Sequence, residues 1–197
     1  MIAFLKGRLV YRDPTHVLVD VNGIGYHVNI SLQTFSAVKE QENIHLFTHL
    51  TIREDAHILF GFSAEDEKKL FQQLISVSGV GPSTAIVMLS YMNTQELKNA
   101  IVREDAASLQ AIKGIGGKTA QRVIIELKDK LKKESWEEAQ PSISSTPHNT
   151  VKKEALSALL TLGLPKAVAE KSIDTVLKKS GNTITLEDLV KQALKNA

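Results

Sequence analysis

Two short glycine-containing segments carry the residue types that can hold a phosphate group. The first is Val77-Ser-Gly-Val-Gly-Pro-Ser-Thr-Ala85, and the second is Ile112-Lys-Gly-Ile-Gly-Gly-Lys-Thr-Ala120. Both follow the scheme apolar-x-Gly-apolar-Gly-x-x-Thr-Ala, and corresponding residues are 35 positions apart. Glycines adopt backbone angles closed to other residues and keep side chains away, so backbone N–H groups can approach an anion closely.

A helical pattern surrounds each segment, which predicts two helix-hairpin-helix motifs. The helix after each hairpin would begin at the glycines, so its unpaired N–H groups and positive dipole end would also face the anion. The apolar residue between the glycines, Val80 or Ile115, is expected to turn inward. A single copy could be an ordinary helix–helix turn, but two copies at one offset favour binding of the DNA backbone without reading of bases.

The predicted DNA contacts follow from this repeat, and the second copy is the more basic through two lysines. The predicted contacts are Ser78, Gly79, Val80, Gly81, Ser83, Lys113, Gly114, Ile115, Gly116, Lys118, Thr119 and Arg122. Arg122 lies one helical turn after Lys118, although a solvated helix face would explain it equally well.

No cofactor, metal site or catalytic residue is predicted. Gly117-Lys118-Thr119 resembles the end of a nucleotide-binding phosphate loop, but that motif needs a glycine where Ile112 stands and a strand before it. The chain has no cysteine, and its six histidines show no pair at metal-ligand spacing on a helix.

The elements that must position these hairpins fall into three segments, an α+β multidomain fold. Residues 1–63 are predicted to form about five short strands, which suits a small closed barrel of the OB type, although an SH3-like barrel would read the same. The expected strands are Ala3–Tyr11, His16–Asp20, Gly25–Ile30, Glu42–Ile52 and Ala56–Phe60.

Helical patterning follows over residues 64–134, the predicted tandem helix-hairpin-helix domain. Capping boxes are expected at Ser63–Asp66 and at Asn93 with Glu96. Residues 135–148 have the composition of a flexible linker. Residues 149–197 are predicted to form a small three-helix, UBA-like domain whose last helix starts at a capping box, Thr185–Asp188, and such a unit usually presents a surface to a partner.

Composition and charge place the chain among soluble globular proteins. Of its 197 residues, 43% are hydrophobic and 23% are charged, and the net charge is +2. The charge is uneven, because residues 63–133 carry +3 and residues 134–148 carry −3. No apolar run could cross a bilayer and no signal peptide is visible, so a cytoplasmic protein with no membrane partner is expected.

Several motifs together resemble the RuvA family of bacterial proteins that bind Holliday junctions. These motifs are Asn22-Gly-Ile-Gly-Tyr26, Phe47-Thr-His49, Arg53-Glu-Asp-Ala56, Phe60-Gly61-Phe62 and the two hairpins. The resemblance covers the whole chain in order. It implies a homotetramer, alone or paired face to face as an octamer, that holds a four-way DNA junction open. It also implies a non-catalytic subunit that directs a separate ATPase, RuvB, in branch migration, while the nuclease RuvC later cuts the junction.

The resemblance also assigns roles to particular residues. Glu54 and Asp55 would be an acidic pin that repels phosphates where strands cross; without the family, an ordinary charged turn is the simpler interpretation. The C-terminal domain would contact RuvB, and Leu162, Leu164 and Leu189 are candidates, although the same residues could fill the core. Ser83 and Gly117 stand where some relatives carry basic residues, so weaker salt dependence per subunit is expected.

Two other classes of function compete with this reading. A glycosylase or lyase would add a catalytic Asp, and often a Lys, in a pocket beside a single hairpin, and no pocket-forming segment follows Lys118. An adaptor could instead bind single strands by stacking bases on barrel aromatics, but aromatic residues make up only 5% of the chain.

Overall fold

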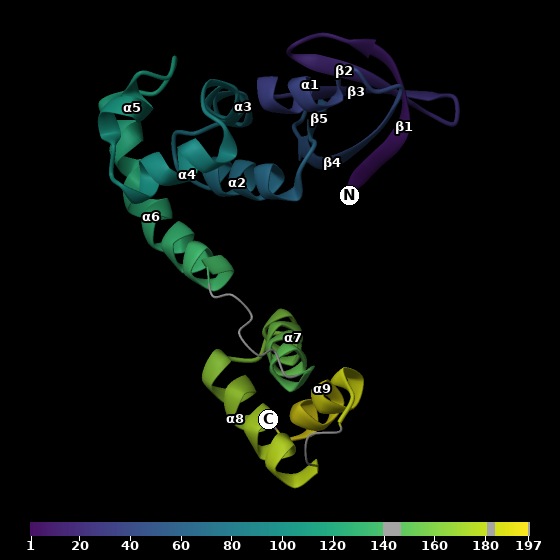
Figure 1. Cartoon of the computed structure of the whole chain (residues 1–197), viewed down its shortest axis with the longest axis vertical. Coiled ribbons are helices and arrows are strands. Elements are labelled where there is room, and N and C mark those ends of the chain that lie inside the picture. The colour runs from purple at the N-terminus through teal and green to yellow at the C-terminus, as the bar shows by residue number, and fades with distance from the viewer. Residues whose placement is uncertain (140–146, 181–183, 197) are drawn as a thin grey trace. The chain divides into compact units, whose positions relative to one another are not determined.

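The computed structural model describes residues 1–139, 147–180 and 184–196. The chain forms two compact units, Met1–Glu137 and Glu138–Ala197, and each is described by itself (Figure 1). The first unit contains a β-barrel and the helices that carry both glycine hairpins. The second unit contains three helices.

Five strands close into a barrel at the start of the first unit. They are β1 (Phe4–Arg12), β2 (His16–Val21), β3 (Ile24–Ile30), β4 (Asn43–Ile52) and β5 (His57–Phe62). The strand order is β1-β2-β3-β5-β4, and β1 pairs with β4 to complete the ring. Only β3 and β5 pair in parallel, while the other four pairs are antiparallel. The barrel is of the OB type, as predicted.

Alternating side chains fill the barrel, and a glycine permits its parallel seam. Val17 and Val19 of β2 are fully buried, and the residues between and beside them face outward. A Cβ at Gly61 would lie 2.5 Å from the Cγ1 atom of Val28. Any larger residue at position 61 would therefore push β5 away from β3.

A short helix between β3 and β4, α1 (Leu32–Val38), was not among the predicted elements. The hydroxyl of Ser31 caps it by accepting a hydrogen bond from the Thr34 N–H at 3.0 Å. Seven residues give too few turns for the apolar periodicity of a helix to stand out in the sequence.

Five helices follow the barrel and form an apolar core separate from the barrel interior, to which Phe60 and Phe62 of β5 contribute. They are α2 (Glu65–Ile75), α3 (Pro82–Tyr91), α4 (Thr94–Val102), α5 (Ala106–Gln110) and α6 (Gly117–Ala139). Phe60 and Phe62 of β5 pack on Phe71 of α2, with ring centroids 5.2 and 4.9 Å apart. The predicted boundary at residues 63/64 thus follows directly after a strand whose side chains also pack on the helices.

Of the two capping boxes predicted for the first unit, one forms and the other does not. Asn93 and Glu96 form a complete box, with both hydrogen bonds at 2.9 Å, which confirms that prediction. The box at Ser63–Asp66 is wrong, because Ala64 is the N-cap and no side chain caps α2. The Ser63 N–H instead donates to the Thr34 hydroxyl at 3.0 Å, so the chain turns toward α1 before the helix begins.

Helix α6 extends to Ala139, so the first five residues of the predicted 135–148 linker are helical. Residues 140–146 of that linker lie outside the described residues. Pro147, at which the next helix begins, also falls within the predicted linker.

The second unit consists of α7 (Pro147–Thr161), α8 (Lys166–Ser180) and α9 (Leu186–Lys195). Its core includes Leu159, Ile173 and Val176, all essentially inaccessible to solvent. The Thr185 hydroxyl caps α9 by accepting from the Asp188 N–H, as the sequence predicts. In the described part of the chain, no helix has the length and apolar character required to cross a membrane.

Candidate nucleic-acid interface

The two glycine hairpins have the same backbone hydrogen bonds. In the first, the Val80 N–H donates to the Val77 carbonyl at 3.0 Å, and in the second the Ile115 N–H donates to the Ile112 carbonyl at the same distance. The first glycine of each hairpin is left-handed, with φ of 93° at Gly79 and 92° at the residue 35 positions later. The sequence repeat is therefore also a repeat of backbone structure.

Apolar side chains fix each hairpin to the helices beneath it. Val77 and Val80 are 2% and 5% exposed, and Ile112 and Ile115 are 1% and 5% exposed. The predicted inward turn of Val80 and Ile115 is therefore confirmed. Their side chains are unavailable to DNA, so any contact that these two residues make must come from the backbone.

The glycines themselves face open space. A Cβ at Gly81, Gly114 or Gly116 would have no heavy atom within 4 Å, and one at Gly79 would meet only the Thr119 hydroxyl, at 3.9 Å. The bare backbone is thus accessible to a phosphate at both hairpins. The contact with Thr119 also shows that the first hairpin lies against the start of α6.

The helices that follow the hairpins begin with uncompensated N–H groups. Gly81 is the N-cap of α3 and no side chain caps that helix, and α6 begins at Gly117 directly after Gly116. Neither helix has an acidic residue in its first turn. Unpaired N–H groups and the positive dipole end therefore remain available to an external anion at both places.

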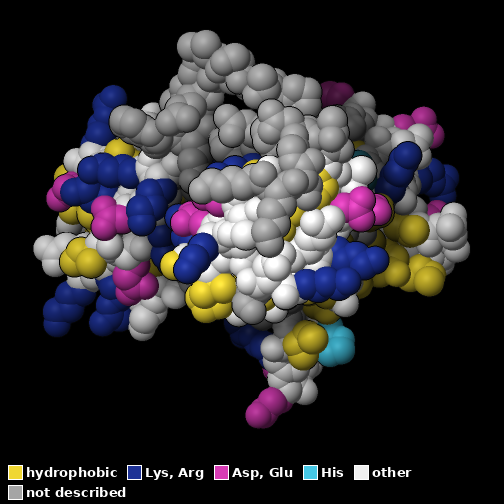
Figure 2. Space-filling model, turned by 90° about the horizontal axis from the view of Figure 1, so that it is seen from below, with side chains coloured by type: hydrophobic (Ala, Val, Ile, Leu, Met, Phe, Trp, Pro, Cys, Tyr) yellow, Lys and Arg dark blue, Asp and Glu magenta, His cyan; other side chains and the backbone are white. Residues whose placement is uncertain are grey.

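Cationic side chains are concentrated at the second hairpin. Lys113 and Lys118 are exposed, and neither takes part in the ion pairs formed by the described residues. Arg122 is also exposed, but its Nη1 atom donates to the carbonyl and hydroxyl of Ser78 in the first hairpin. On the face seen in Figure 2, Lys and Arg are interspersed with Asp and Glu.

Glu54 and Asp55 occupy the tip of the β4–β5 hairpin. The Arg53 N–H donates to the Ala56 carbonyl at 2.8 Å, which closes a tight turn with the two acidic residues at its centre. Both side chains are exposed. Two carboxylates on a projecting turn create a local negative potential that repels phosphate.

The three predicted partner-contacting residues lie in different environments. Leu162 is 59% exposed, in the turn between α7 and α8. Leu164 is partly buried and packs on the core of the second unit. Leu189 is fully buried in that core, so it cannot be a contact residue without unfolding of α9.

Comparison with known proteins accounts for the chain along nearly its whole length. A family model described as "RuvA N terminal domain" matches residues 1–61, "SAM-like Helix-hairpin-helix tandem" matches 71–129, and "RuvA, C-terminal domain" matches 150–197. A Cytophaga hutchinsonii protein named "Holliday junction branch migration complex subunit RuvA" is 55% identical over 197 residues, 99% of each chain. The chain belongs to the RuvA family.

Relatives with the same printed name occur in other organisms. The protein from Flavobacterium psychrophilum is 48% identical over 196 residues, the full length of both chains. The protein from Geotalea daltonii is 41% identical over 199 residues, 99% of this chain and 98% of the relative. The similarity to the RuvA family therefore spans both units.

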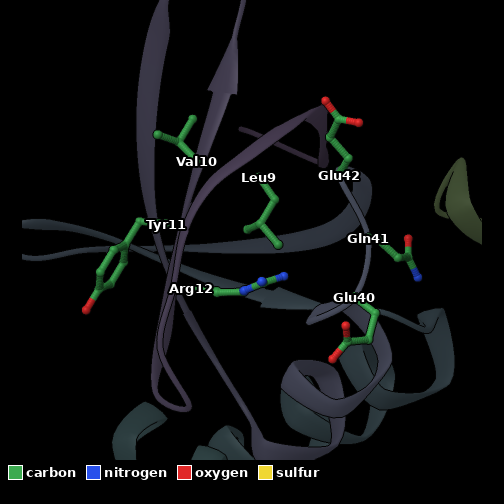
Figure 3. A pocket seen from close by; sticks show the side chains of 7 residues that line it. All are labelled: Leu9, Val10, Tyr11, Arg12, Glu40, Gln41 and Glu42. Atoms are coloured by element: carbon green, nitrogen blue, oxygen red, sulfur yellow. The ribbon is translucent and has the colours of Figure 1, made fainter.

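The barrel of this RuvA-family protein has a hollow of its own, away from the hairpins. Among the described residues, no group of three or more His, Cys, Asp or Glu side chains could hold a metal ion. A hollow beside the end of β1 is lined by Leu9–Arg12 and Glu40–Glu42. The Arg12 side chain extends into it, and its guanidinium group donates to the Lys39 carbonyl (Figure 3). The hollow brings together none of the predicted DNA contacts.

Sequence reasoning missed two features of the hairpin site. Thr84 corresponds to Thr119 and is half-buried like it, and the constant offset could have revealed it. The bond between Arg122 and Ser78 joins the two copies, and nothing in the spacing signals it, because the residues are 44 positions apart.

Proposed function

We propose that this RuvA-family protein is the Holliday-junction-binding subunit of a branch migration complex. The observation that carries the proposal is the pair of equivalent, solvent-facing glycine hairpins in a chain similar along its length to proteins named as that subunit. The hairpins hold DNA through backbone phosphates, and therefore bind without regard to sequence.

Choice of a junction over a linear duplex comes from the acidic tip. Glu54 and Asp55 stand on a tight turn that would meet the DNA where the four arms converge in a homotetramer. Four such tips around one axis repel the phosphates at the crossover and keep the arms apart.

The subunit acts without catalysing a reaction itself. The sequence Gly117-Lys118-Thr119 follows a helix, α5, rather than the strand that a nucleotide-binding phosphate loop requires. ATP hydrolysis belongs to the separate RuvB subunit, which the second unit contacts, and RuvC joins the larger complex. Leu162 is the candidate contact that remains exposed.

The test compares the affinity for a synthetic four-way junction with that for a linear duplex of equal length. We expect a clear preference for the junction, and equal affinities would contradict the proposal. The mass of the free and junction-bound protein, measured in the same buffer, gives the stoichiometry. A monomer bound to one arm would contradict the tetrameric part.

A further inference from the structure

The two hairpins differ in charge although their backbones correspond. At equivalent positions, Lys113, Lys118 and Arg122 of the second copy replace Ser78, Ser83 and Val87 of the first. Residues 72–97, which include the whole first hairpin and α3, contain no Lys or Arg. The first hairpin therefore brings no cation of its own to a phosphate.

Arg122 is attached to this uncharged hairpin although it belongs to the second repeat. Its Nη1 atom lies 3.3 Å from the Ser78 carbonyl oxygen and 3.1 Å from the Ser78 hydroxyl oxygen. Ser78 directly precedes Gly79, the left-handed glycine that turns the hairpin. We propose that Arg122 is the cation of the first hairpin, which it both positions and charges from across the repeat.

The chemistry of the guanidinium group suits this double role. It carries five N–H donors in a planar fork, and the two on Nη1 can bond to the carbonyl and hydroxyl of Ser78. The three donors on Nε and Nη2 remain for a phosphate, with the geometry that favours two parallel hydrogen bonds. A lysine has a single ammonium group and could not offer both sets of donors in fixed directions.

The contact at Thr119 supports the same assignment. Its hydroxyl lies 3.9 Å from where a Cβ of Gly79 would be, so the first hairpin rests on the opening turns of α6. Arg122 emerges one turn later on that helix. The cation and the hairpin are thus fixed by the same piece of structure.

The inference rests on the proposed function only in taking DNA as the ligand of the hairpins. It is tested with two lysine substitutions that each add a cation at the start of the helix after one hairpin. Ser83→Lys adds a cation at the second residue of α3, and Gly117→Lys adds one at the first residue of α6. Each is combined with Arg122→Gln, and the affinities for a linear duplex and a four-way junction are measured.

We expect Arg122→Gln to weaken binding about tenfold and to lower the salt-dependence slope by about one. Ser83→Lys should improve binding by much more in the Arg122→Gln background than in the wild type, because both cations neutralise the same phosphate. Gly117→Lys should improve binding by the same factor in both backgrounds, because it serves the other hairpin.

The reverse pattern, with Gly117→Lys coupled to Arg122 and Ser83→Lys additive, would assign Arg122 to the second hairpin and overturn the inference. Coupling with both lysines, or with neither, would also overturn it. If the protein shows no preference for a junction, the affinities for the linear duplex still distinguish these outcomes. A wild-type protein that binds neither DNA would refute the proposed function itself.

The substitution Arg122→Lys distinguishes the positioning role of Arg122 from the effect of its charge. The lysine retains the charge, so the salt-dependence slope should stay close to that of the wild type, while the affinity falls several-fold because the bonds to Ser78 are lost. Equal affinity for Arg122→Lys and the wild type would show that positioning contributes nothing. Thermal unfolding of each variant checks that the exposed substitution leaves the fold intact.

Discussion

At the scale of single residues, the second glycine of each hairpin has no structural need to be glycine. Gly81 has an ordinary φ of −85°, and a Cβ there would meet nothing. The same holds at Gly116, whose φ is not left-handed. The first glycines, Gly79 and Gly114, are instead required by their positive φ. The absence of a side chain at the second positions suits close approach of a ligand to the backbone.

We expect the double substitution Gly81→Ala/Gly116→Ala to weaken DNA binding by about tenfold or more, because two methyl groups would hold the phosphates away from the N–H donors. The free energy of unfolding should change by less than about 1 kcal/mol per site, since neither Cβ clashes. Fluorescence anisotropy and urea unfolding measure the two quantities.

Gly25→Ala is the matched control for this variant. Gly25 lies in β3, and a Cβ there also meets nothing within 4 Å. Its affinity for DNA should equal that of the wild type. An alanine pair that binds normally would show that close backbone approach is unnecessary.

The acidic tip makes a second prediction at this scale. We expect Glu54→Gln/Asp55→Asn to strengthen binding to linear duplex several-fold and so to reduce the preference for a junction, because the repulsion of phosphates is removed. Glu40→Gln/Glu42→Gln removes the same charge elsewhere on the barrel and should leave the preference unchanged. Equal effects from both pairs would mean that net charge alone, not the tip, matters.

The tetrapeptide Arg53-Glu-Asp-Ala56 at the tip does not by itself determine the local structure. Arg-Glu-Asp-Ala occurs a second time, at residues 103–106. There Glu104 pairs with Lys128, and Asp105 caps α5 by accepting from Ser108, contacts that lower the pKa of both carboxyl groups. Identical residues thus hold a helix turn in one place and project into solvent in another. Their context within the fold decides between the two.

At the scale of elements, the corrected helix cap has a measurable consequence. Asn93→Ala should lower the free energy of unfolding by about 1 kcal/mol, because α4 loses the hydrogen bond that the Glu96 N–H donates to the Asn93 side chain. Ser63→Ala should leave it nearly unchanged, because the Ser63 side chain caps nothing and only its backbone N–H is bonded. Urea unfolding measures both, and equal losses would restore Ser63 as a cap.

Glu67 links two elements through a buried carboxylate. It lies on α2 without solvent exposure and accepts hydrogen bonds from the hydroxyls of Ser31 and Thr34, the latter at 2.7 Å. Burial raises the pKa of Glu67 above its usual range, although these hydrogen bonds oppose the shift. Helix α1 is therefore fastened to α2 by a buried carboxyl group whose pKa is raised.

This pKa shift predicts the pH dependence of stability. Because the folded state holds the proton more tightly, the stabilising contribution of Glu67 is fully present below its ordinary pKa and is lost as the pH rises through the raised value. The free energy of unfolding of the wild type, relative to Glu67→Gln, should therefore fall as the pH rises above about 4.5 and then level off. A pH-independent difference in urea unfolding would contradict it.

Elements with long sequence patterns were predicted, and elements with short patterns were missed. The five strands and both hairpins were predicted because alternation and a two-copy repeat each span many residues. Helix α1 was not, because seven residues show too little helical period. The Glu67 cluster was not, because its hydrogen bonds join residues 33 and 36 positions apart. Leu189 was misplaced as a contact for a related reason. A three-helix unit has so few apolar residues that core and surface stripes look alike.

At the scale of the whole molecule, the two compact units should separate in function. Deleting residues 149–197 leaves the first unit, Met1–Glu137, complete. We expect the truncated protein to bind junctions as the full chain does but to lose all stimulation of the RuvB ATPase. A truncated protein that still stimulates RuvB would place the contact in the first unit.

The hairpins also bear on how DNA can move through such a complex. Contacts made only to the repeating phosphate backbone are recovered after every displacement by one base pair. The bound duplex therefore meets a periodic energy profile whose minima are equally deep, whatever sequence passes. A motor that moves the duplex therefore crosses the same energy barrier at every base pair, and no particular sequence holds the duplex in place.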